Sequence, residues 1–290
     1  MSAVLAGCAA DDTSAPDDAP GVVNQAARAL LPEDVLASNV LKVGTPFGVP
    51  PSIYFDEDGE LIGAGYEIVN AVGDALGVQM EWHEAQFSGI VTGVQSGNFD
   101  LSAGVISDTP ARQEQLDFVD WLRSENALLV LKDNPAGITG LASACGHSVG
   151  VLAGGQQLAL VEAASAECTA AGEASIDIRE YPGTSDAQVQ VQSGRLDAFV
   201  GPSVSFLYMV NETDGGELFS IADERYPENP AGFAYAKNRP GLGEAIQLAL
   251  RGIVEDGTYL EILNRYGVGE LAVSPEQVVI NGAGTDAFAQ

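Results

Sequence analysis

Apolar side chains in the first half of the chain recur with the spacing of helices that pack on a sheet. In residues 66–76 they fall three and four apart, which puts them on one face of a helix. They are Ile68, Val69, Val72 and Leu76. A second helix is expected to begin at Ser88, whose hydroxyl can cap it, and to end at Gly97.

Short apolar runs between the helices predict buried strands. Residues 127–131 form one such run, and a turn-rich stretch follows at 133–137. Residues 149–152 predict another strand, which leads through a turn at 154–156 into a helix, and the free N–H groups of such a junction can hold an anion. This alternation predicts an α/β protein with mostly parallel sheets flanked by helices. The last helices are expected at 242–254 and 258–266.

The charge balance restricts the partners. Of 290 residues, 12 are Lys or Arg and 41 are Asp or Glu, which gives a net charge of −29. Such a chain repels nucleic acid and anionic lipid, so neither is expected as a partner. A hydrophobic content of 46% with 18% charged residues is that of an ordinary globular protein with one large core or two smaller ones.

The amino terminus points to an anchored protein. Residues 4–8 read VLAGC and resemble the lipobox of bacterial lipoproteins, in which the cysteine, here Cys8, is acylated. The alternative is a chance apolar run before a cysteine. A full signal has a basic region and about 7–15 apolar residues before its cleavage site, so we expect this start to be truncated. Residues 9–21 are rich in Ala, Asp and Pro, and we expect residues 1–38 to comprise the signal remnant and a flexible tether.

One arginine follows a strand end in a hydroxyl-rich turn, where residues 104–118 read GVISDTPARQEQLDF. In an acidic protein the guanidinium of Arg112 suits a small carboxylate, because its fork donates two parallel charge-assisted hydrogen bonds. The alternative is an exposed arginine in the first turn of a helix. The pattern Ser-Asp-Thr-Pro-x-Arg followed by Leu-Asp-Phe resembles the signature of amino-acid-type solute-binding proteins of ABC importers, which have the type II periplasmic-binding fold.

The resemblance extends over residues 40–268, and its other pieces follow in the family's order. They are LKVG at 41–44, PSIYF at 51–55 (an imperfect match), the strand-to-helix unit at 59–77, FSGI at 87–90 with QSGNFD at 95–100, GRLDAF at 194–199 and GTYLEIL at 257–263.

The resemblance implies two lobes, each a mostly parallel sheet flanked by helices, joined by two crossover strands. The crossovers are expected at 133–137 and 233–237, and the chain then divides into lobe 1, lobe 2 and a C-terminal tail. Their expected ranges are 39–131 plus 236–270 for lobe 1, 132–235 for lobe 2 and 271–290 for the tail.

The implied function is that of an extracytoplasmic receptor, lipid-anchored to the outer face of the cell membrane. It would capture a small carboxylated solute, an amino acid or a derivative, and deliver it to the permease subunits of an ABC importer, without a cofactor, metal or catalytic residue. A dehydratase-like enzyme on the same fold is the alternative. It would need a general acid or base in the cleft, and the two histidines lie outside the cleft motifs.

The same resemblance implies the residues of lobe 1 that hold the solute. Arg112 is expected to bind the ligand carboxylate, and Ser107 to place a hydroxyl and an amide near its polar head. The carbonyl of Val105 is expected to accept from the ligand's ammonium. Phe87 is expected as an aromatic wall and Phe47 as a ring facing the cleft, with core packing as the alternative for both.

In lobe 2 the resemblance places Gly155 and Gln156 in the turn that completes the grip on the carboxylate. It also shows a departure: amino-acid binders of the family have an aspartate for the ammonium where this chain has Pro202. Proline offers neither a charge nor an N–H group, and a desolvated ammonium needs a counter-ion. Either another carboxylate enters the cleft, or aromatic faces hold a diffuse cation, or the ligand has no amine.

Two cysteines remain when Cys8 is assigned to the anchor. Residues 141–176, which contain Cys145 and Cys168, resemble an actinobacterial branch of the family that carries this pair. An even number in an extracytoplasmic protein also favours a disulfide. Two buried free thiols are the alternative, and a metal site is less favoured because His83 and His147 show no ligand spacing with them.

Overall fold

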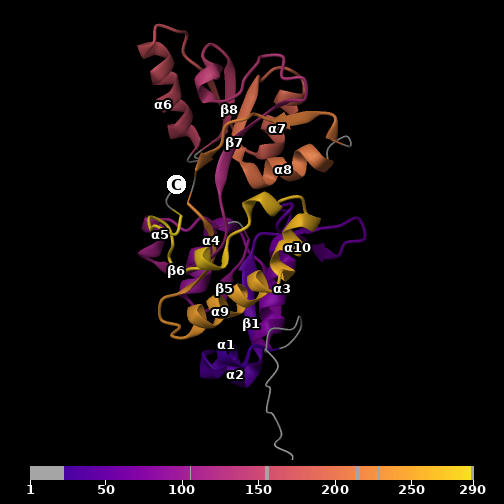
Figure 1. Cartoon of the computed structure of the whole chain (residues 1–290), viewed down its shortest axis with the longest axis vertical. Helices are drawn as coiled ribbons and strands as arrows, with labels where there is room; N and C mark the ends of the chain where they lie inside the picture. Colours follow the sequence, from indigo (N-terminus) through magenta and orange to yellow (C-terminus); the bar gives the residue numbers. More distant parts are fainter. Residues whose placement is uncertain (1–22, 105, 154–156, 213–215, 228, 289–290) are drawn as a thin grey trace, which may run out of the picture.

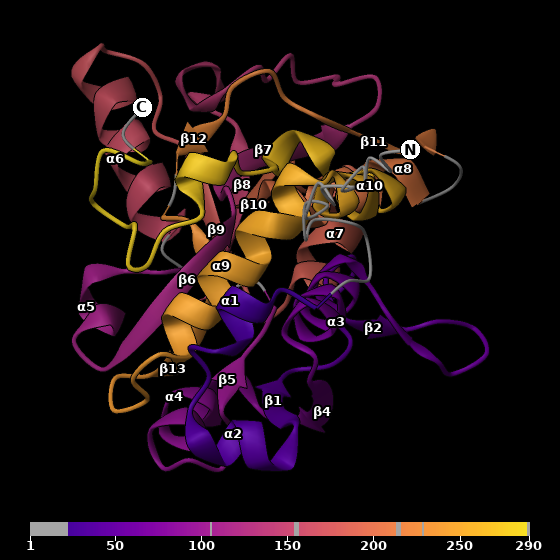
Figure 2. The same ribbon diagram turned by 60° about the horizontal axis from the view of Figure 1, so that its bottom comes forward.

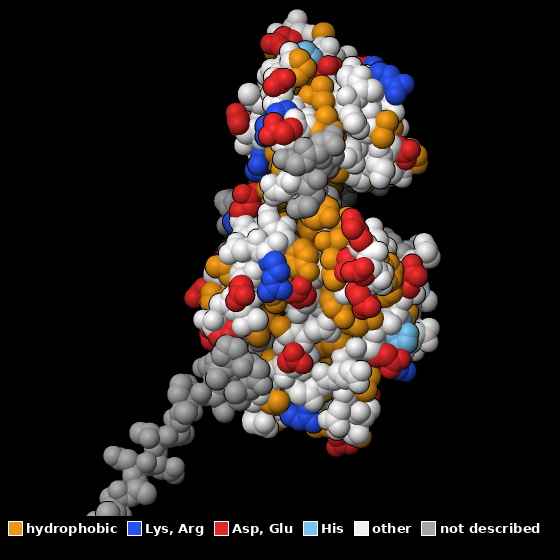
Figure 3. All heavy atoms as spheres, turned by 90° about the vertical axis from the view of Figure 1, so that its right-hand side faces the viewer, with side chains coloured by type: hydrophobic (Ala, Val, Ile, Leu, Met, Phe, Trp, Pro, Cys, Tyr) orange, Lys and Arg blue, Asp and Glu red, His pale blue; other side chains and the backbone are white. Residues whose placement is uncertain are grey.

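The computed structural model describes residues 23–104, 106–153, 157–212, 216–227 and 229–288. They form two lobes, one above the other, each built on its own sheet (Figure 1). A space-filling view shows the waist between the lobes (Figure 3). The expected two-lobe α/β fold is confirmed.

The lobe 1 sheet has the strand order β4-β1-β5-β13-β6. The strand β1 pairs in parallel with β4 and β5, whereas β13 is antiparallel to both β5 and β6. The sheet is therefore mostly parallel, with β13 as its reversed strand. The bounds are β1 Val40–Thr45, β4 Gln79–Glu84, β5 Leu101–Ser102, β6 Leu116–Leu122 and β13 Ala231–Ala236.

The lobe 2 sheet has the order β11-β7-β10-β8-β9, with β12 paired to β7. Here β7 is the reversed strand, because it is antiparallel to β10, β11 and β12 while β8 pairs in parallel with β9 and β10. The bounds are β7 Glu125–Leu131, β8 Ser148–Leu152, β9 Asp177–Tyr181, β10 Ala198–Pro202, β11 Phe219–Ile221 and β12 Tyr226–Pro227.

Each reversed strand is the one that follows a crossover. The chain leaves β6 through Arg123 and Ser124 and enters lobe 2 as β7, and it returns from β12 to lobe 1 as β13. A strand that enters a lobe at the edge facing the other lobe must run against its neighbours. The carboxyl ends of the parallel strands of both sheets therefore face the waist, which is where open α/β sheets bind ligands.

The expected lobe boundaries are wrong by about one strand at each crossover. Residues 125–131 were assigned to lobe 1, but they are β7 of lobe 2, and the stretch 133–137 is a turn within lobe 2. Residues 231–235 belong to lobe 1 as most of β13. The first crossover carries no turn signal, because Arg123 and Ser124 merely separate two apolar runs. The turn residues at 133–137 therefore suggested a boundary one strand too late.

Helices cover both sheets, and the helix expected at 66–76 is confirmed as α3. The next helix begins at Phe87 with Gln86 as its N-cap, so Ser88 is not the cap. In lobe 1, α3 packs against α9 and α10. The bounds are α3 Ala64–Leu76, α4 Phe87–Gln95, α5 Pro110–Gln113, α6 Gln157–Ala170, α7 Thr184–Gln192, α8 Ser203–Glu212, α9 Leu242–Glu255 and α10 Thr258–Arg265, with a small hairpin of β2 Tyr54–Phe55 and β3 Leu61–Ile62.

Part of the expected tether is folded. Residues 24–38 form α1 (Gln25–Arg28) and α2 (Glu33–Ser38), and α1 packs against α3 and α9 (Figure 2). Ala27 of α1, Leu31 of the turn between the helices and Val35 of α2 are all buried in the lobe 1 core. The tether prediction is therefore wrong for these residues, because their apolar side chains pack on lobe 1. Residues 1–22, including Cys8, lie outside the described residues.

The C-terminal residues 271–288, here called the C-terminal segment, are a packed part of lobe 1. Val273 and Val278 are buried, and the side chain of Arg251 in α9 donates to the carbonyls of Pro275 (3.1 Å) and Val278 (3.0 Å). The segment runs along the outer edge of β6, where Ala272 bridges to Leu122. The expectation of a separate tail is therefore wrong.

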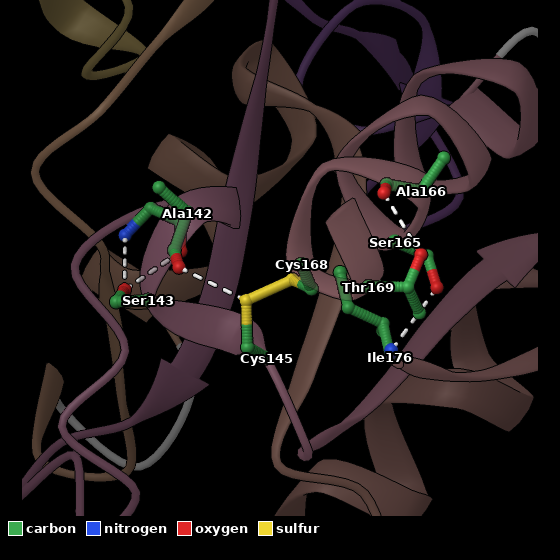
Figure 4. The surroundings of a disulfide bond; sticks show 9 residues. Ala142, Ser143, Cys145, Ser165, Ala166, Cys168, Thr169 and Ile176 are labelled. Atoms are coloured by element: carbon green, nitrogen blue, oxygen red, sulfur yellow. Dashed lines mark hydrogen bonds between the residues drawn. A yellow bond between two sulfur atoms is a disulfide. The ribbon is translucent and has the colours of Figure 1, made fainter. Parts of the chain in front are cut away.

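The expected disulfide is confirmed in lobe 2 (Figure 4). Cys145 follows the short 3-10 helix Leu141–Ala144, and Cys168 is buried in the last turn of α6. Their Cα atoms are 5.6 Å apart, which is a normal separation for a disulfide. The bond ties α6 to the start of β8.

Candidate functional site

The ends of β1 and β5 lie on the side of lobe 1 that faces the waist. Thr45 ends β1, and its buried hydroxyl donates to the carbonyl of Ala103, just beyond β5, at 2.7 Å. Gly104 then adopts a φ of +97°, a conformation that side chains rarely allow. A Cβ atom there would lie 3.1 Å from the Thr45 hydroxyl. The chain can therefore turn sharply at the strand end and lead into the segment that carries Arg112.

Arg112 lies in α5, a four-residue helix with Pro110 in its first turn and Thr109 as its N-cap. The Thr109 hydroxyl accepts from the Arg112 backbone N–H at 3.2 Å. The half-buried guanidinium folds back, and its Nη1 donates to the carbonyl of Ser107 at 2.7 Å. Ser107 in turn bridges to Ala231, the first residue of β13. Arg112 and Ser107 are thus in contact, next to the second crossover.

A cavity of about 380 Å³ lies between the lobes. Lobe 1 contributes the loop after β1, and lobe 2 contributes the first turn of α7 and the outer face of α8. The lining residues are Gly48, Val49, Pro50, Thr184, Ser185, Gln188, Ser205, Tyr208 and Met209. The ring of Tyr208 also contacts the ring of Tyr54 at a centroid distance of 5.8 Å, so one aromatic pair spans the cleft.

A smaller cavity of about 90 Å³ continues from Val49 into lobe 1. Its wall is mainly apolar, with Ile53 and Ile106 at its base, and it also includes Ser52. The Ser52 hydroxyl is buried and has no hydrogen-bond partner among the described residues. This oxygen packs against Gly65 of α3, where an added Cβ atom would lie 2.6 Å from it, so it belongs to the packing of lobe 1 rather than to the open surface of the cavity.

A hollow of about 640 Å³ lies at the other end of β1. Arg239 in its lining already pairs with Asp34 at 2.7 Å and with Asp100 at 2.8 Å. Because the lining has three carboxylates, those of Asp34, Glu81 and Asp100, against the two cations Arg239 and Lys42, it disfavours a carboxylated solute. The cleft at the waist is the better candidate site.

The other residues expected from the sequence are placed as follows. The half-buried Phe47 ring packs edge-on against the exposed Phe55 at 5.7 Å and borders the lobe 1 core, so its role as a ring facing the cleft stays a prediction. Pro202 ends β10 opposite Asn126 of β7. Val105, Gly155 and Gln156, and the side chain of Phe87, lie outside the described residues.

Amides surround the position of Pro202. The buried Asn126 accepts a hydrogen bond of 2.9 Å from Gln157, the first residue of α6. The next residue, Ser203, has a buried hydroxyl without a partner among the described residues. Sequence reasoning missed Asn126, Gln157 and Tyr208, because single polar residues at strand and helix ends carry no signal until the strand register is known.

Two fully buried carboxyl groups lie directly behind the Arg112 segment. Burial raises the pKa of Asp108, and burial together with the charge of Asp108 raises the pKa of Asp120 to about 8. The backbone N–H groups of Ala283 and Gly282 donate to Asp108 (3.1 Å) and Asp120 (2.8 Å), respectively. These carboxyl groups therefore bind the C-terminal segment.

No group of three or more His, Cys, Asp or Glu side chains that could hold a metal ion occurs between residues 23 and 288, apart from the four undescribed gaps. Within the same ranges, no helix is long and apolar enough to cross a membrane.

Comparison with known proteins agrees with this geometry. Residues 41–269 match the sequence model of the bacterial extracellular solute-binding proteins, family 3. The chain is 28% identical to the arginine-binding protein ArgT of Corynebacterium glutamicum over 260 residues, which cover 88% of this chain and 81% of that protein. It is 26% identical to the lysine/arginine/ornithine-binding periplasmic protein of Escherichia coli, with 82% and 89% covered.

Solved structures show the same fold. An ancestral arginine-binding protein bound to arginine is 30% identical, with a TM-score of 0.62, and the match covers 79% of this chain and 98% of that one. An ancestral amino acid-binding protein described as a precursor of cyclohexadienyl dehydratase is 25% identical, with a TM-score of 0.67 and coverage of 82% and 99%. The relatives and structures named here are binding proteins. The chain therefore belongs to the bacterial extracellular solute-binding proteins of family 3, and its role is that of a receptor rather than an enzyme.

Proposed function

We propose that this receptor holds a small carboxylated solute in the cleft between its lobes, with Arg112 as the main carboxylate ligand, and delivers it to the permease of an ABC importer. The observation that carries the proposal is the placement of Arg112. Its guanidinium is kept half-buried on the Ser107 carbonyl, beside the crossover and next to the strand ends of lobe 1. One Nη1 hydrogen bond to the Ser107 carbonyl helps to orient the guanidinium fork.

The neighbouring cavities suit a small solute. The 90 Å³ cavity offers a mainly apolar wall, and the 380 Å³ cavity offers Tyr208 and hydroxyl groups from α7 and α8. Gly155 and Gln156 would complete the grip on the carboxylate when the lobes close, and Val105 and Phe87 would contact the same ligand. These four assignments come from the family resemblance.

The second charge of an amino-acid solute, the positive one, needs a binding partner as well. The relatives named above include arginine-binding proteins, so arginine and other cationic amino acids are candidates. Opposing this, Pro202 pairs with Asn126, a neutral amide bound to Gln157, and neither side chain supplies a counter-ion. We therefore expect weak binding of ordinary α-amino acids and better binding of a carboxylate whose cation is diffuse or absent.

A thermal-shift screen tests the proposal. Amino acids, betaines, ectoines and small carboxylates would be compared, since a ligand at a hundred times its Kd stabilises the folded form by about 2.7 kcal/mol. A carboxylated compound should stabilise the protein, and its uncharged amide analogue should not. Stabilisation by neutral sugars alone would contradict the proposal.

We also propose that Cys8 is acylated and anchors the receptor to the outer face of the cell membrane. The VLAGC sequence before it and the extracellular family support this. Changing Cys8→Ala should release the protein from the membrane fraction of expressing cells. Equal membrane retention of the variant and the parent would contradict it.

A further inference from the structure

Asp108 joins three separate parts of the molecule. Its two carboxyl oxygens accept from the side-chain amide of Gln113 in α5, at 2.8 and 3.0 Å. One of them also accepts from the backbone N–H of Ala283 at 3.1 Å, and the Asp108 N–H donates to the carbonyl of Pro230 at 2.8 Å. The helix that carries Arg112, the C-terminal segment and the second crossover therefore meet at one fully buried side chain.

The C-terminal segment is fixed independently of Asp108, so it can act as a support. Along β6, the Asp120 N–H donates to the Val279 carbonyl at 3.0 Å, and the Asn281 N–H donates to the Phe118 carbonyl at 2.9 Å. Gly282 then donates to the Asp120 carboxyl at 2.8 Å. In Figure 1 this yellow segment runs beside α5. It thus extends along the lobe 1 sheet beyond β6 and contacts Asp108 through Ala283.

The short helix α5 needs such a support. It has four residues, none of them buried, and a helix of this length is unstable without outside contacts. Its attachments to the rest of lobe 1 include the Gln113 amide on Asp108, one residue from Arg112. Losing the acceptor would remove one of the contacts that orient α5 and, with it, the guanidinium of Arg112.

We propose that Asp108 is a positioning residue for solute binding: by tying α5 to the C-terminal segment and to the second crossover, it holds Arg112 in the direction that receives the solute carboxylate. This inference rests on the proposed role of Arg112. It makes the C-terminal segment a functional part of the cleft, although the segment itself lies on the outer edge of the lobe 1 sheet.

The side-chain chemistry supports a carboxyl group at this position. Two donors converge on Asp108 through different elements, and a carboxylate can accept both at once. Asp108→Asn keeps the size of the side chain but replaces one of the two acceptor oxygens with an NH2 group, so it loses at least one of the three hydrogen bonds that Gln113 and Ala283 donate. The raised pKa of Asp108 shows that burial is only partly offset by these donors.

The test compares three full-length variants with the parent. Asp108→Asn weakens the link, Gln113→Leu removes its α5 side, and Asp120→Asn is the matched control. Asp120 binds the same C-terminal segment through Gly282, and no hydrogen bond to α5 is found among its contacts within the described residues.

Hydrogen–deuterium exchange of the peptide covering residues 106–115 is measured first, without ligand. Exchange should be about tenfold faster in the first two variants, because a lost hydrogen bond to a charged group weakens the local structure to that extent, and unchanged in Asp120→Asn.

Binding is then measured by calorimetry with four probes: L-arginine, L-glutamine, glycine betaine and 4-methyl-2-oxopentanoate. Any probe that the parent binds should bind about tenfold or more weakly to Asp108→Asn. In the Arg112→Ala background, Asp108→Asn should have little further effect, because its influence passes through Arg112.

The outcomes separate this inference from the proposed function. If Arg112→Ala leaves the affinity of every bound probe unchanged, the proposed function fails. If Arg112→Ala weakens binding but Asp108→Asn does not, or if Asp108→Asn weakens it equally without Arg112, only the positioning role fails. Unchanged exchange at residues 106–115 in both Asp108→Asn and Gln113→Leu overturns the inference whether or not a probe binds.

Discussion

Asp120 should make the stability of lobe 1 depend on pH in a direction opposite to that of most carboxylates. Burial and the nearby Asp108 raise its pKa from 3.8 to about 8 in the folded protein. Between these two values the folded chain holds a proton that the unfolded chain has lost. The free energy of unfolding must therefore fall as the pH rises from about 4 to about 8. The stabilisation is complete below the unfolded pKa and is lost as the pH passes the folded pKa.

The size of the effect follows from the shift. Each pH unit between the two pKa values changes the free energy of unfolding by about 1.4 kcal/mol, so the contribution of Asp120 between pH 5 and pH 8 is about 4 kcal/mol. The change Asp120→Asn removes the titration. Its amide oxygen can still accept from the Gly282 N–H, so the packing of the C-terminal segment should be preserved.

Urea unfolding at pH 5 to 8 measures this, with tryptophan fluorescence as the signal. Trp121 follows Asp120 in β6 and stacks on Phe233 of β13, so its emission reports on lobe 1. The stability difference between Asp120→Asn and the parent should grow by about 4 kcal/mol in favour of the variant from pH 5 to pH 8. Parallel pH curves for the two proteins would refute the reasoning.

Two further predictions concern lobe 2. Cys145 and Cys168 are 23 residues apart, so removing the disulfide with a double alanine variant should lower the free energy of unfolding by about 3 kcal/mol. Thiol labelling of the denatured, unreduced parent should find neither cysteine reactive. Recovery of two labelled cysteines beyond position 10 would contradict the bond. Pro202→Asp should shift binding toward ordinary α-amino acids, because it supplies a counter-ion for the ammonium. Sub-micromolar binding of glutamine or arginine by the parent would show that another acid already supplies this counter-ion.

The order of strands and helices could be predicted because each element carries its own signal. The helix at 66–76 has apolar residues on one face, and the run at 127–131 is long enough for one buried strand. The disulfide followed from the number of cysteines and the family resemblance. These features depend on neighbours in the sequence.

The position of the crossovers could not be predicted in the same way. Nothing local distinguishes a strand that stays in its lobe from one that enters the other lobe, and Arg123-Ser124 is too short to give a turn signal. The sheet to which β7 belongs depends on its partners β10 and β11, which lie about 70 to 90 residues later in the sequence.

Only the local part of the candidate site could be predicted from the sequence. Arg112 and Ser107 lie five residues apart, and their contact belongs to one local turn. Tyr208 and the buried Asp108 contacts involve segments far apart in the sequence: Tyr208 meets Tyr54, and Asp108 meets Ala283. Long-range pairs of this kind are visible only once the chain is folded.

The most direct measurement of the central claim is a calorimetric titration of the tightest carboxylated solute from the screen into the parent and into Arg112→Ala. Arg179→Ala serves as the control, because Arg179 is an exposed arginine of lobe 2 that pairs with Asp177 and its removal changes the net charge equally. Arg112→Ala should keep the fold and weaken binding by about 3–5 kcal/mol, the expected cost of unpairing a desolvated charge, while the control binds as the parent does. Equal affinity of Arg112→Ala and the parent would contradict the claim that this guanidinium holds the solute.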